Sequence, residues 1–439
     1  MPGLPSTPAA DQATTPPARR RIAKVAFASW VGASIEWYDF FIYGTAAALV
    51  FPRLFFPAQE PLTATLLSFT TFGVAFVARP FGGALFGHIG DTIGRRKTLV
   101  IALVAMGAAT TLIGLLPTYS AIGAAAPVLL VVLRLIQGIT VGGQQGGVIL
   151  LATENSPASR RGFYGSLASA GAPGGVLLAN GAFLLVLATT SDEAFLAWGW
   201  RVPFVASILL VAVAVTIQLR LEETSDFRAA RTGERRRSPV VEAIRRHPRQ
   251  VLLAAGCYLA INLTYYQFIT FVVAYGTNPA ILGLPQGTML TAIMIASAVE
   301  LVGLPAAGLL SDRFGRRQVF AAGAVLLGVF SFVFWPLVDS GSFALITVAL
   351  VIGLGLVHSL MYGPQGALFS EAFSTEVRYS ALSLGIQLGS VIGGAFAPFI
   401  ATALLKGFGS STAIAAYMAG ACAISAACTI ALRPARAAA

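Results

Sequence analysis

One short pattern occurs twice in this chain, about half a chain length apart. Residues 87–96 and 308–317 both read Gly-x3-Asp-x2-Gly-Arg-Arg, with an offset of 221 residues between the two copies. Each copy follows one long apolar run and precedes another, which predicts a short loop between two membrane helices. The glycines permit a tight turn, and the aspartate can cap a helix start. The repeat therefore predicts a membrane protein built from two similar halves.

The composition agrees with a protein that lies in a membrane. Of the 439 residues, 56% are hydrophobic and only 11% are charged, whereas soluble domains carry roughly a quarter charged residues. Runs of about 20 apolar residues, long enough to cross a bilayer, fall near 24–51, 62–87, 98–117, 124–152, 162–189, 201–220, 250–276, 287–310, 318–338, 342–369, 379–405 and 411–432. We predict an all-α membrane protein with twelve transmembrane helices in two pseudo-symmetric six-helix bundles.

The runs also predict how the chain is divided. We expect a disordered cytoplasmic tail rich in Pro, Ala and Thr, an N-terminal bundle, a cytoplasmic linker, a C-terminal bundle and a second short tail, at 1–20, 21–220, 221–249, 250–433 and 434–439. The first apolar run is too long for a cleaved signal peptide. The linker holds eight arginines, and both a solvated segment and contact with anionic lipid remain open for it.

The basic residues predict the orientation. With both termini inside, Arg53, Arg201 and Lys406 fall outside and Arg79 and Arg134 lie within helices, so the other 24 of the 29 Lys and Arg residues are cytoplasmic. Such a bias is typical of inner-membrane proteins. We therefore expect a multi-pass membrane protein with both termini cytoplasmic. We also expect a monomer in the lipid bilayer.

A second pair of cytoplasmic loops repeats at nearly the same offset. Glu154 precedes Arg160 and Arg161, and Glu371, 217 residues later, precedes Arg378. Together with the two copies of the first pattern, these loops predict ion-paired gates that form when the cytoplasmic face closes. The gate residues that we expect are Gly87, Asp91, Arg95, Arg96, Glu154, Asp312, Arg316, Glu371 and Arg378.

Two acidic residues lie inside the first apolar run. Glu36 and Asp39, with Tyr43, follow i, i+3, i+7 spacing and share one helical face. Two carboxylates this close do not both ionise easily in a medium of low dielectric, so one of them can carry a proton. The alternative is a structural pair neutralised by Arg79 or Arg134.

Further polar residues mark helices 4, 7, 8 and 10. Charged or polar groups at membrane depth are typical of functional or paired positions. Arg134 is a natural fork for a carboxylate, either of a substrate or of the helix 1 acids. Glu300 is either a second proton site or the partner of an arginine, and a lone histidine such as His358 is more often a hydrogen-bonded core residue than a proton relay. The substrate-binding residues that we expect are Tyr43, Arg134, Gln137, Gln144, Asn262, Tyr265, Tyr266, His358, Tyr362 and Gln365.

The repeated pattern resembles the signature loop of the major facilitator superfamily, which lies between helices 2 and 3 and between helices 8 and 9. Several stretches resemble its metabolite:proton symporter branch, namely Glu36-Trp37-Tyr38-Asp39-Phe40, Arg79-Pro80-Phe81-Gly82-Gly83, Trp198-Gly199-Trp200-Arg201-Val202-Pro203-Phe204 and Asn262 to Tyr266. Arg134-x-x-Gln137-Gly138 is similar to a superfamily motif associated with proton coupling. The resemblance implies import of 2-oxoglutarate, citrate, shikimate, proline or betaine with protons across the bacterial inner membrane.

One position departs from that branch. Its members commonly carry Gly-Gly-Glu and an aromatic residue on helix 4, whereas here Gly142-Gly143 is followed by Gln144-Gln145. A glutamine cannot titrate, so Glu36, Asp39 and Glu300 remain as the expected proton carriers.

The sequence thus favours a secondary transporter that imports a small carboxylate or zwitterion with protons by alternating access. A proton-coupled exporter is the nearest alternative, because Gly171-Ala172-Pro173-Gly174-Gly175 faintly resembles an antiporter signature. A ligand-sensing receptor is a further alternative, which a long signalling domain would favour. We expect no enzyme, cofactor or nucleotide, because no phosphate-binding loop or nucleophile–base pairing occurs. No basic, aromatic-rich surface for nucleic acid occurs, and Cys257, Cys422 and Cys428 lack metal-ligand spacing.

Overall fold

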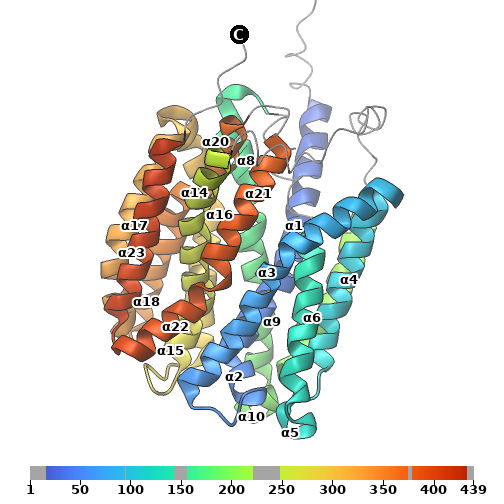
Figure 1. The fold of residues 1–439 in the computed structure, drawn as a ribbon, viewed down its shortest axis with the longest axis vertical. Helices are drawn as coiled ribbons and strands as arrows, with labels where there is room; N and C mark the ends of the chain where they lie inside the picture. The colour runs from blue at the N-terminus through green and yellow to red at the C-terminus, as the bar shows by residue number, and fades with distance from the viewer. Residues whose placement is uncertain (1–15, 94, 143–155, 221–247, 374–377, 433–439) are drawn as a thin grey trace, which may run out of the picture.

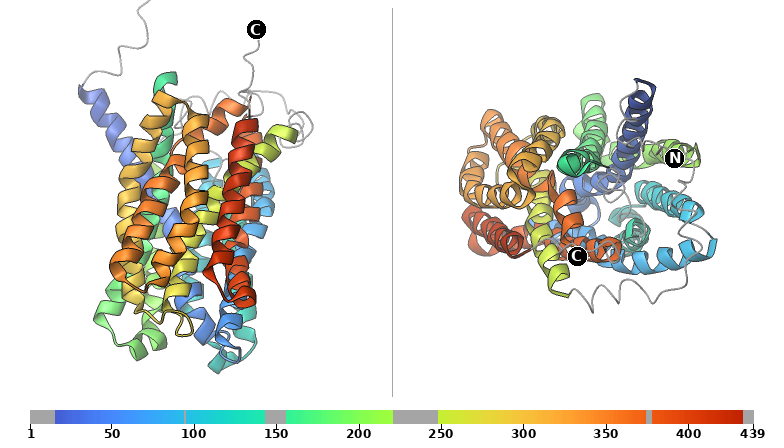
Figure 2. Two further views of the ribbon diagram at one scale, coloured as in Figure 1. Left: turned by 90° about the vertical axis from the view of Figure 1, so that its left-hand side faces the viewer. Right: turned by 90° about the horizontal axis from the view of Figure 1, so that it is seen from above.

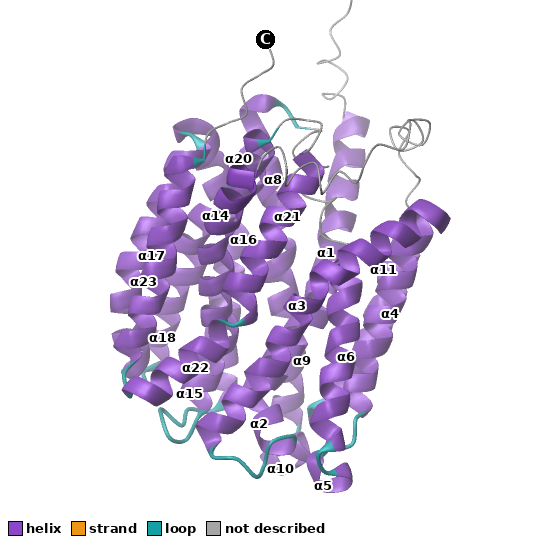
Figure 3. Cartoon of the chain, viewed as in Figure 1, coloured by secondary structure: helices purple, strands orange, loops and turns teal. Residues whose placement is uncertain are grey.

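A computed structural model of the chain describes residues 16–93, 95–142, 156–220, 248–373 and 378–432. Within these ranges the chain is helical and forms no strand, and short connections join long rods that run in similar directions (Figure 3). Apolar residues dominate each rod. Because an α-helix satisfies its own backbone hydrogen bonds, it is the natural form for such segments in lipid.

The first half of the chain supplies six rods. Three of the connections between them contain a short helix, α2 (Phe51–Leu54), α5 (Tyr119–Ile122) or η2 (Ala158–Arg160). The rods are α1 (Pro16–Leu49), α3 (Pro61–Ile93), α4 (Arg95–Leu115), α6 (Ala125–Gly142), α8 with α9 (Arg161–Ser169, Gly171–Thr189), and α10, η3 and α11 (Asp192–Ala194, Phe195–Gly199, Arg201–Arg220).

The second half supplies six more rods, three of which contain a π-helical segment. The rods are α14, η5 and α15 (Pro248–Tyr266, Gln267–Phe271, Val272–Thr277), α16 (Gln286–Phe314), α17 (Arg316–Asp339), α18, η6, α19 and α20 (Phe343–Leu350, Val351–His358, Ser359–Tyr362, Gln365–Ala372), α21, η7 and α22 (Arg378–Ser390, Val391–Ala395, Ala397–Phe408), and α23 (Ser411–Ala431). π-Helical turns are rare and often lie at functional positions.

The rods satisfy the length and composition of membrane spans. Among the described residues, ten helices are long and apolar enough, or eleven if Asp192–Gly199 and Arg201–Thr216, which meet at 48°, form one span. α1 has 34 residues and packs along α9, so it completes the first set of six. The predicted arrangement of twelve membrane helices in two six-helix bundles is confirmed.

The two bundles lie side by side, as the view from above shows (Figure 2). α16 of the second half packs on α8 and α9 of the first, while α3 packs on α21, η7 and α22. α1 meets η5 and α15 between these two seams. Residues from α1, α3, α14 and α16 are therefore placed to meet near the middle of the molecule (Figure 1).

The second copy of the repeated pattern is mostly helical, which corrects the prediction of a loop. α16 continues to Phe314, only Gly315 turns, at φ +95°, and α17 begins at Arg316. In the first copy, α3 ends at Ile93 and α4 begins at Arg95. A left-handed φ of this kind favours glycine, so Gly315 suits a turn this tight.

Asp312 caps a helix, but the helix belongs to the other half of the chain. Its carboxylate accepts hydrogen bonds from the backbone N–H groups of Gly162 (2.9 Å) and Phe163 (3.0 Å) at the start of α8. The helices touch there, since a Cβ built on Gly162 would lie 2.6 Å from the Gly308 carbonyl oxygen. We call this end of the bundle, with α8 and α20, the Arg316 end (Figure 1).

The opposite end, which we call the Lys406 end, has its own contact between the halves. Lys406 at the end of α22 donates to Glu60 (3.2 Å) and to Thr63 (2.6 Å) at the start of α3. Backbone N–H groups of Leu62 and Thr63, the Thr63 hydroxyl and Lys406 lower the pKa of Glu60 to about 2, with the Leu62 N–H contributing most. The halves are thus in contact at both ends in this structure.

Enlarging Gly162 is expected to open the Arg316 end. With Cys257, Cys422 and Cys428 replaced by alanine and a cysteine introduced at buried Ser311, Gly162→Ala should raise labelling by a membrane-impermeant thiol reagent several-fold, because the added methyl group would overlap α16. Gly420→Ala is the control, since nothing lies within 4 Å of a Cβ there. Equal labelling in the two variants would contradict the close contact.

Removing the Lys406 amine is expected to loosen the other end. In the same cysteine-free background, Lys406→Met should increase labelling of a cysteine at buried Thr402, while Lys406→Arg should not. The Glu60 carboxylate supports the contact fully above its ordinary pKa of 4.5 and loses it only as the pH falls towards about 2. Once corrected for the fall of the reactive thiolate fraction with pH, labelling of the cysteine at 402 with Lys406 intact should therefore stay constant from neutral pH to about pH 5. A rise within that range would count against the pair.

Candidate functional site

Arg134 lies in the middle of α6 and is fully buried. It donates to Gln137 (3.0 Å), which in turn donates to Thr110 on α4 (2.7 Å). Its guanidinium also lies 4.0 Å from the centroid of the Tyr43 ring and 4.6 Å from that of Phe40, both on α1. Cation–π contacts of this kind contribute about 0.5–2 kcal/mol each. The helix 1 and helix 4 residues predicted from the sequence, Tyr43, Arg134 and Gln137, are thus brought together.

Arg79 on α3 is a second buried arginine in the same place. Its guanidinium lies 4.2 Å from the ring centroid of Phe76 and 4.7 Å from that of Phe40, so the two arginines share the Phe40 ring. Arg79 also meets the hydroxyl group of Tyr266, from α14. Neither arginine forms an ion pair with an acid among the described residues.

Glycines allow α3 and α6 to approach closely beside these arginines. A Cβ built on Gly138 would lie 2.7 Å from the Cα of Ala75, and one on Gly82 would lie 2.6 Å from the carbonyl carbon of Ile139. Larger residues would push the helices apart. The glycines of the Arg134 motif therefore pack helices, and by doing so they hold the two guanidinium groups near one aromatic ring.

The two acids of α1 have different surroundings. Glu36 lines a small internal pocket with Trp37, Phe40, Arg79 and Val141. Asp39 is 1% exposed, and neither of its carboxyl oxygens has a hydrogen-bond partner among the described residues. The alternative, that an arginine neutralises Glu36 and Asp39 as a structural pair, is therefore not supported by an ion pair among the described residues. Arg79 does lie close enough to Glu36 to interact with it.

In the second half, the side chains of Glu300 and His358 form a buried pair. Glu300 Oε1 and His358 Nδ1 are 3.1 Å apart, and both side chains are fully buried. His358 Nε2 lies 3.1 Å from the carbonyl oxygen of Ile261. The partner of Glu300 is thus a histidine and not an arginine, and His358 is the last residue of the π-helical segment η6.

Two tyrosines surround this pair. The Tyr265 ring lies 5.3 Å from the His358 ring and the Tyr362 ring lies 5.5 Å from it, measured between centroids. The Tyr265 hydroxyl has no hydrogen-bond partner among the described residues. Tyr265, His358 and Tyr362 were all predicted from the sequence, and the structure places them in one cluster with Glu300.

The remaining predicted residues of the second half lie nearby but have other partners. Asn262 donates to Ser390 on α21 (2.9 Å). Gln365 donates to Ser169 of the first half at 3.5 Å, and its side-chain oxygen has no partner among the described atoms. Tyr266 packs on Phe40, Phe72 and Phe76 of the first half.

Aromatic contacts join the two clusters across the halves. Phe40 meets Tyr266 with 6.0 Å between ring centroids, and Phe41 meets Tyr265 with 5.8 Å. The guanidinium groups of Arg79 and Arg134 both lie over the Phe40 ring, and the Tyr265 ring contacts His358. A change in either cluster therefore reaches α1 or α14, the two helices that face each other at the centre.

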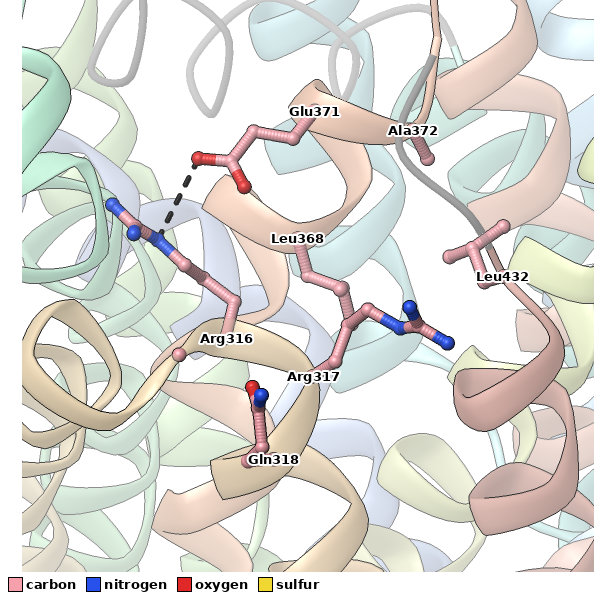
Figure 4. Close-up of a pocket in the computed structure, with 8 residues that line it drawn as sticks. Arg316, Arg317, Gln318, Leu368, Glu371, Ala372 and Leu432 are labelled. Carbon is pink, nitrogen blue, oxygen red and sulfur yellow. Dashed lines mark ion pairs between the residues drawn. The ribbon is translucent and has the colours of Figure 1, made fainter. Parts of the chain in front are cut away.

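At the Arg316 end, three of the predicted gate residues meet. Arg316 pairs with Asp312 (2.9 Å) and, from its Nε, with Glu371 (3.5 Å), beside a pocket lined by Arg317, Gln318 and Leu432 (Figure 4). The backbone of Gly87, Asp91, Arg95, Arg96 and Arg378 is helical, but their side chains lie outside the described part of the structure, and Gln144 and Glu154 lie outside the described residues.

Sequence reasoning missed several residues that the structure places at the centre. Phe72 and Phe76 look like ordinary apolar positions. Phe40 and Arg79 belong to stretches that resemble the symporter branch, but the sequence suggested only a counter-charge role for Arg79 and none for Phe40. Thr110, Ser169 and Ser390 give no sequence signal at all, since hydroxyl residues are common in membrane helices. An arginine inside an apolar run is the physical signal for Arg79.

The arrangement as a whole offers buried polar atoms that lack partners among the described residues. They include Nε and Nη2 of Arg79 and of Arg134, both oxygens of Asp39, Oε2 of Glu300 and the Tyr265 hydroxyl. Nε and Nη2 form one edge of a guanidinium, which can bind a carboxylate through two hydrogen bonds. Such a centre can hold a small anion and protons. No group of three metal-ligating side chains occurs in the described part of the chain.

Comparison with known proteins identifies the family. A family model described as Major Facilitator Superfamily matches residues 29–384 and 275–439. The inner membrane metabolite transport protein YhjE of Escherichia coli is 43% identical over 390 residues, covering 88% of each chain. The shikimate transporter of the same organism is 40% identical over 410 residues, covering 92% of this chain and 93% of the other. A proline/betaine transporter of Salmonella typhimurium is 33% identical over 385 residues, covering 85% and 76%.

Solved structures share the fold. The partially occluded inward open conformation of the xylose transporter XylE from Escherichia coli covers 94% of this chain and 98% of its own, with a TM-score of 0.72 and 17% sequence identity. A crystal structure of a D-xylose-proton symporter covers 94% and 97%, with a TM-score of 0.73 and 17% identity. The resemblance drawn from the sequence motifs is thus confirmed, and the chain belongs to the major facilitator superfamily of membrane transporters.

Proposed function

We propose that this transporter imports a small metabolite, a carboxylate or a zwitterion, together with protons by alternating access. The observation that carries the proposal is the centre between the two halves, where buried acids and buried guanidinium edges lack full partners among the residues that the structure describes. The relatives named as metabolite, shikimate and proline/betaine transporters support this substrate class. The solved structure titled as a proton symporter supports the fold that such coupling uses.

Arg134 would bind the negative group of the substrate, with Arg79 beside it. Their free Nε and Nη2 atoms offer two forks in a medium of low dielectric, where charge-assisted hydrogen bonds are strong. Tyr43, Gln137, Tyr265, Tyr266, Asn262, Tyr362, His358 and Gln365 would line the rest of the path, with Gln144 from the part of α6's run that the structure leaves out. The aromatic rings suit an apolar carbon skeleton.

Glu36, Asp39 and Glu300 would carry the protons. A buried carboxylate without a counter-charge costs several kcal/mol, so a carboxyl group in the position of Asp39 is favoured as the neutral acid until its surroundings change. An arriving anion on Arg134 and a proton on a nearby acid keep the centre neutral together. That mutual neutralisation is a physical reason for coupling the two cargoes.

The two ends of the bundle would act as alternating gates. In this proposal the Arg316 end is cytoplasmic, as the positive charge of its loops favours, and both termini and the 221–249 linker lie on that side. The bundles would comprise residues 21–220 and 250–433. The protein would work as a monomer in the bacterial inner membrane, where each bundle rocks about the central contacts.

The glycine-proline segment that suggested an exporter has a packing role. A Cβ on Gly171 would meet Ala33 Cα at 3.5 Å, and one on Gly175 would lie 2.5 Å from the Cβ of Trp37. The segment therefore packs α9 against α1, which gives its glycines a structural reason that does not require export. Export remains the alternative outcome of the transport assay.

Uptake into proteoliposomes tests the proposal. Labelled shikimate, proline, glycine betaine and 2-oxoglutarate are offered with and without an inward proton gradient. Accumulation of one class that collapses with a protonophore supports proton symport. Exchange that ignores the gradient would contradict coupling, and efflux of loaded compounds against an inward proton gradient would establish the exporter.

Replacing Arg134 is expected to weaken binding of an anionic substrate selectively. Arg134→Gln removes the charge, and Arg134→Lys keeps it without the fork. Losing a charged hydrogen bond costs about 1.5–3 kcal/mol, so the dissociation constant should rise roughly ten- to a hundredfold for Gln and less for Lys. Binding is measured by scintillation proximity with the labelled compound that enters. Unchanged affinity in both variants would make Arg134 a structural residue.

Neutralising the helix 1 acids is expected to separate binding from energy coupling. Asp39→Asn and Glu36→Gln should abolish gradient-driven accumulation, because an amide cannot carry the proton. Substrate exchange between equal internal and external pools should persist in at least one of them. Thr45→Val, on the same helix as the two acids, removes the hydrogen bond from Thr45 to Asn180 of α9 and serves as a control for folding. Normal accumulation in both acid variants would exclude them as carriers.

A further inference from the structure

The second half contains an acid–imidazole pair whose role the sequence left open. Glu300 lies in the middle of α16 and His358 lies at the end of η6, so two different rods supply the two groups. Their side chains are 0% exposed, and Oε1 lies 3.1 Å from Nδ1. No arginine or lysine of the described residues pairs with Glu300.

The surroundings fix one tautomer of the histidine. Nε2 lies 3.1 Å from the Ile261 carbonyl oxygen, and a carbonyl can only accept a hydrogen bond. Nε2 therefore carries a hydrogen atom, whatever the state of the rest of the ring. All change of protonation is confined to Nδ1 and to the Glu300 carboxyl group that faces it.

This restriction gives the pair a simple proton count. With one hydrogen between them, the pair is neutral overall, as imidazolium with carboxylate or as imidazole with carboxylic acid. One more proton makes imidazolium facing a neutral acid, and one fewer leaves a carboxylate facing a neutral ring. The pair can thus take up or give one proton while Nε2 keeps its hydrogen bond.

Polar atoms at the pair also lack hydrogen-bond partners among the described residues, which is not expected of an ion pair that only stabilises the fold. Glu300 Oε2 has no hydrogen-bond partner among the described residues, and the same holds for the hydroxyl of Tyr265 beside the histidine ring. Buried polar atoms of this kind are rare unless they have a use. The titratable groups that face the pair are the phenols of Tyr265 from α14 and Tyr362 from α19, and the phenol of Tyr258 faces these two tyrosines.

The pair is mechanically connected to the centre through α14. Ile261, which accepts from His358, lies one turn before Tyr265 on that helix, and Tyr265 contacts Phe41 of α1. An imidazolium donates more strongly to the Ile261 carbonyl than a neutral ring does. The charge state of the pair therefore changes the hydrogen bond to α14, the helix that contacts α1 of the first half.

We infer that Glu300 and His358 together form a proton-binding site of the second half, distinct from the acids of α1, in which His358 binds the proton that Glu300 shares. The inference rests on the proposed proton coupling for its use in transport, but the site itself stands on the geometry of the pair. The site binds a single proton, and its protonation state changes the strength of the hydrogen bond from His358 to α14.

The histidine content of the chain permits a direct test. His358 is one of three histidines, so His88→Gln and His247→Gln leave it as the only one. The full-length double variant is purified with ¹⁵N-labelled histidine, and its ring nitrogens are followed by NMR across the pH range in which it stays folded. We expect Nε2 to remain protonated throughout while Nδ1 changes state.

Variants of the neighbours assign the response to the pair. Glu300→Gln should shift the pH at which Nδ1 changes, while Gly420→Ala, where nothing lies within 4 Å of the added Cβ, should leave that pH unchanged. In infrared difference spectra, one protonated-carboxyl band should follow the same pH change and be absent from Glu300→Gln. An Nδ1 that keeps one state throughout, or that ignores Glu300→Gln, would overturn the inference.

None of these readouts needs a transported substrate, so the outcome is separable from that of the proposed function. A pair that titrates in a protein without gradient-driven uptake would uphold the site and contradict symport. A silent pair in a protein that does accumulate substrate would leave symport to the α1 acids and refute the second site.

Discussion

Arg134 lies fully buried in α6 with its guanidinium on the Tyr43 ring at 4.0 Å and a hydrogen bond to Gln137 at 3.0 Å. A charged group in this position costs several kcal/mol in a membrane, and its aromatic and amide contacts offset only part of that. The Phe40 ring lies beside both Arg134 and Arg79, and it also contacts Tyr266 of the other half. In the proposed mechanism an anion would complete this centre, where α1, α3 and α6 bring the two guanidinium groups onto one aromatic ring.

The ends of the bundle hold the halves together with contacts of unequal strength. At the Arg316 end, the Asp312 carboxylate accepts two backbone hydrogen bonds across the halves, and such charged bonds contribute about 1.5–3 kcal/mol each. The half-exposed Lys406–Glu60 pair is of the surface kind, whose contribution is about 0–1 kcal/mol. The Lys406 end is thus the easier one to open from the structure as it stands. An unpaired central charge costs several kcal/mol, which is of the same order as these end contacts, so in the proposed mechanism cargo that neutralises the centre would shift that balance.

The fold could be predicted from sequence because its determinants are local or repeated. Each rod is an apolar run of about bilayer length, and the duplicated Gly-x3-Asp-x2-Gly-Arg-Arg pattern gave the two halves. The site was predicted only as separate polar stripes. That Glu300 meets His358 depends on how α16 packs against η6, whose π-helical turns shift the register away from the regular helical period. Asp312 was expected to cap a neighbouring helix start, but its partner, α8, lies about 150 residues away and no local rule identifies it.

Counting both cargoes together tests most directly whether proton and substrate movements are coupled at this buried centre. Proteoliposomes with a trapped pH-sensitive dye and no initial pH gradient are given an inward gradient of the labelled substrate identified by uptake. The proposed mechanism predicts acidification of the interior in fixed proportion to the substrate that enters. Substrate entry without acidification of the interior, at a rate that a protonophore does not alter, would contradict it.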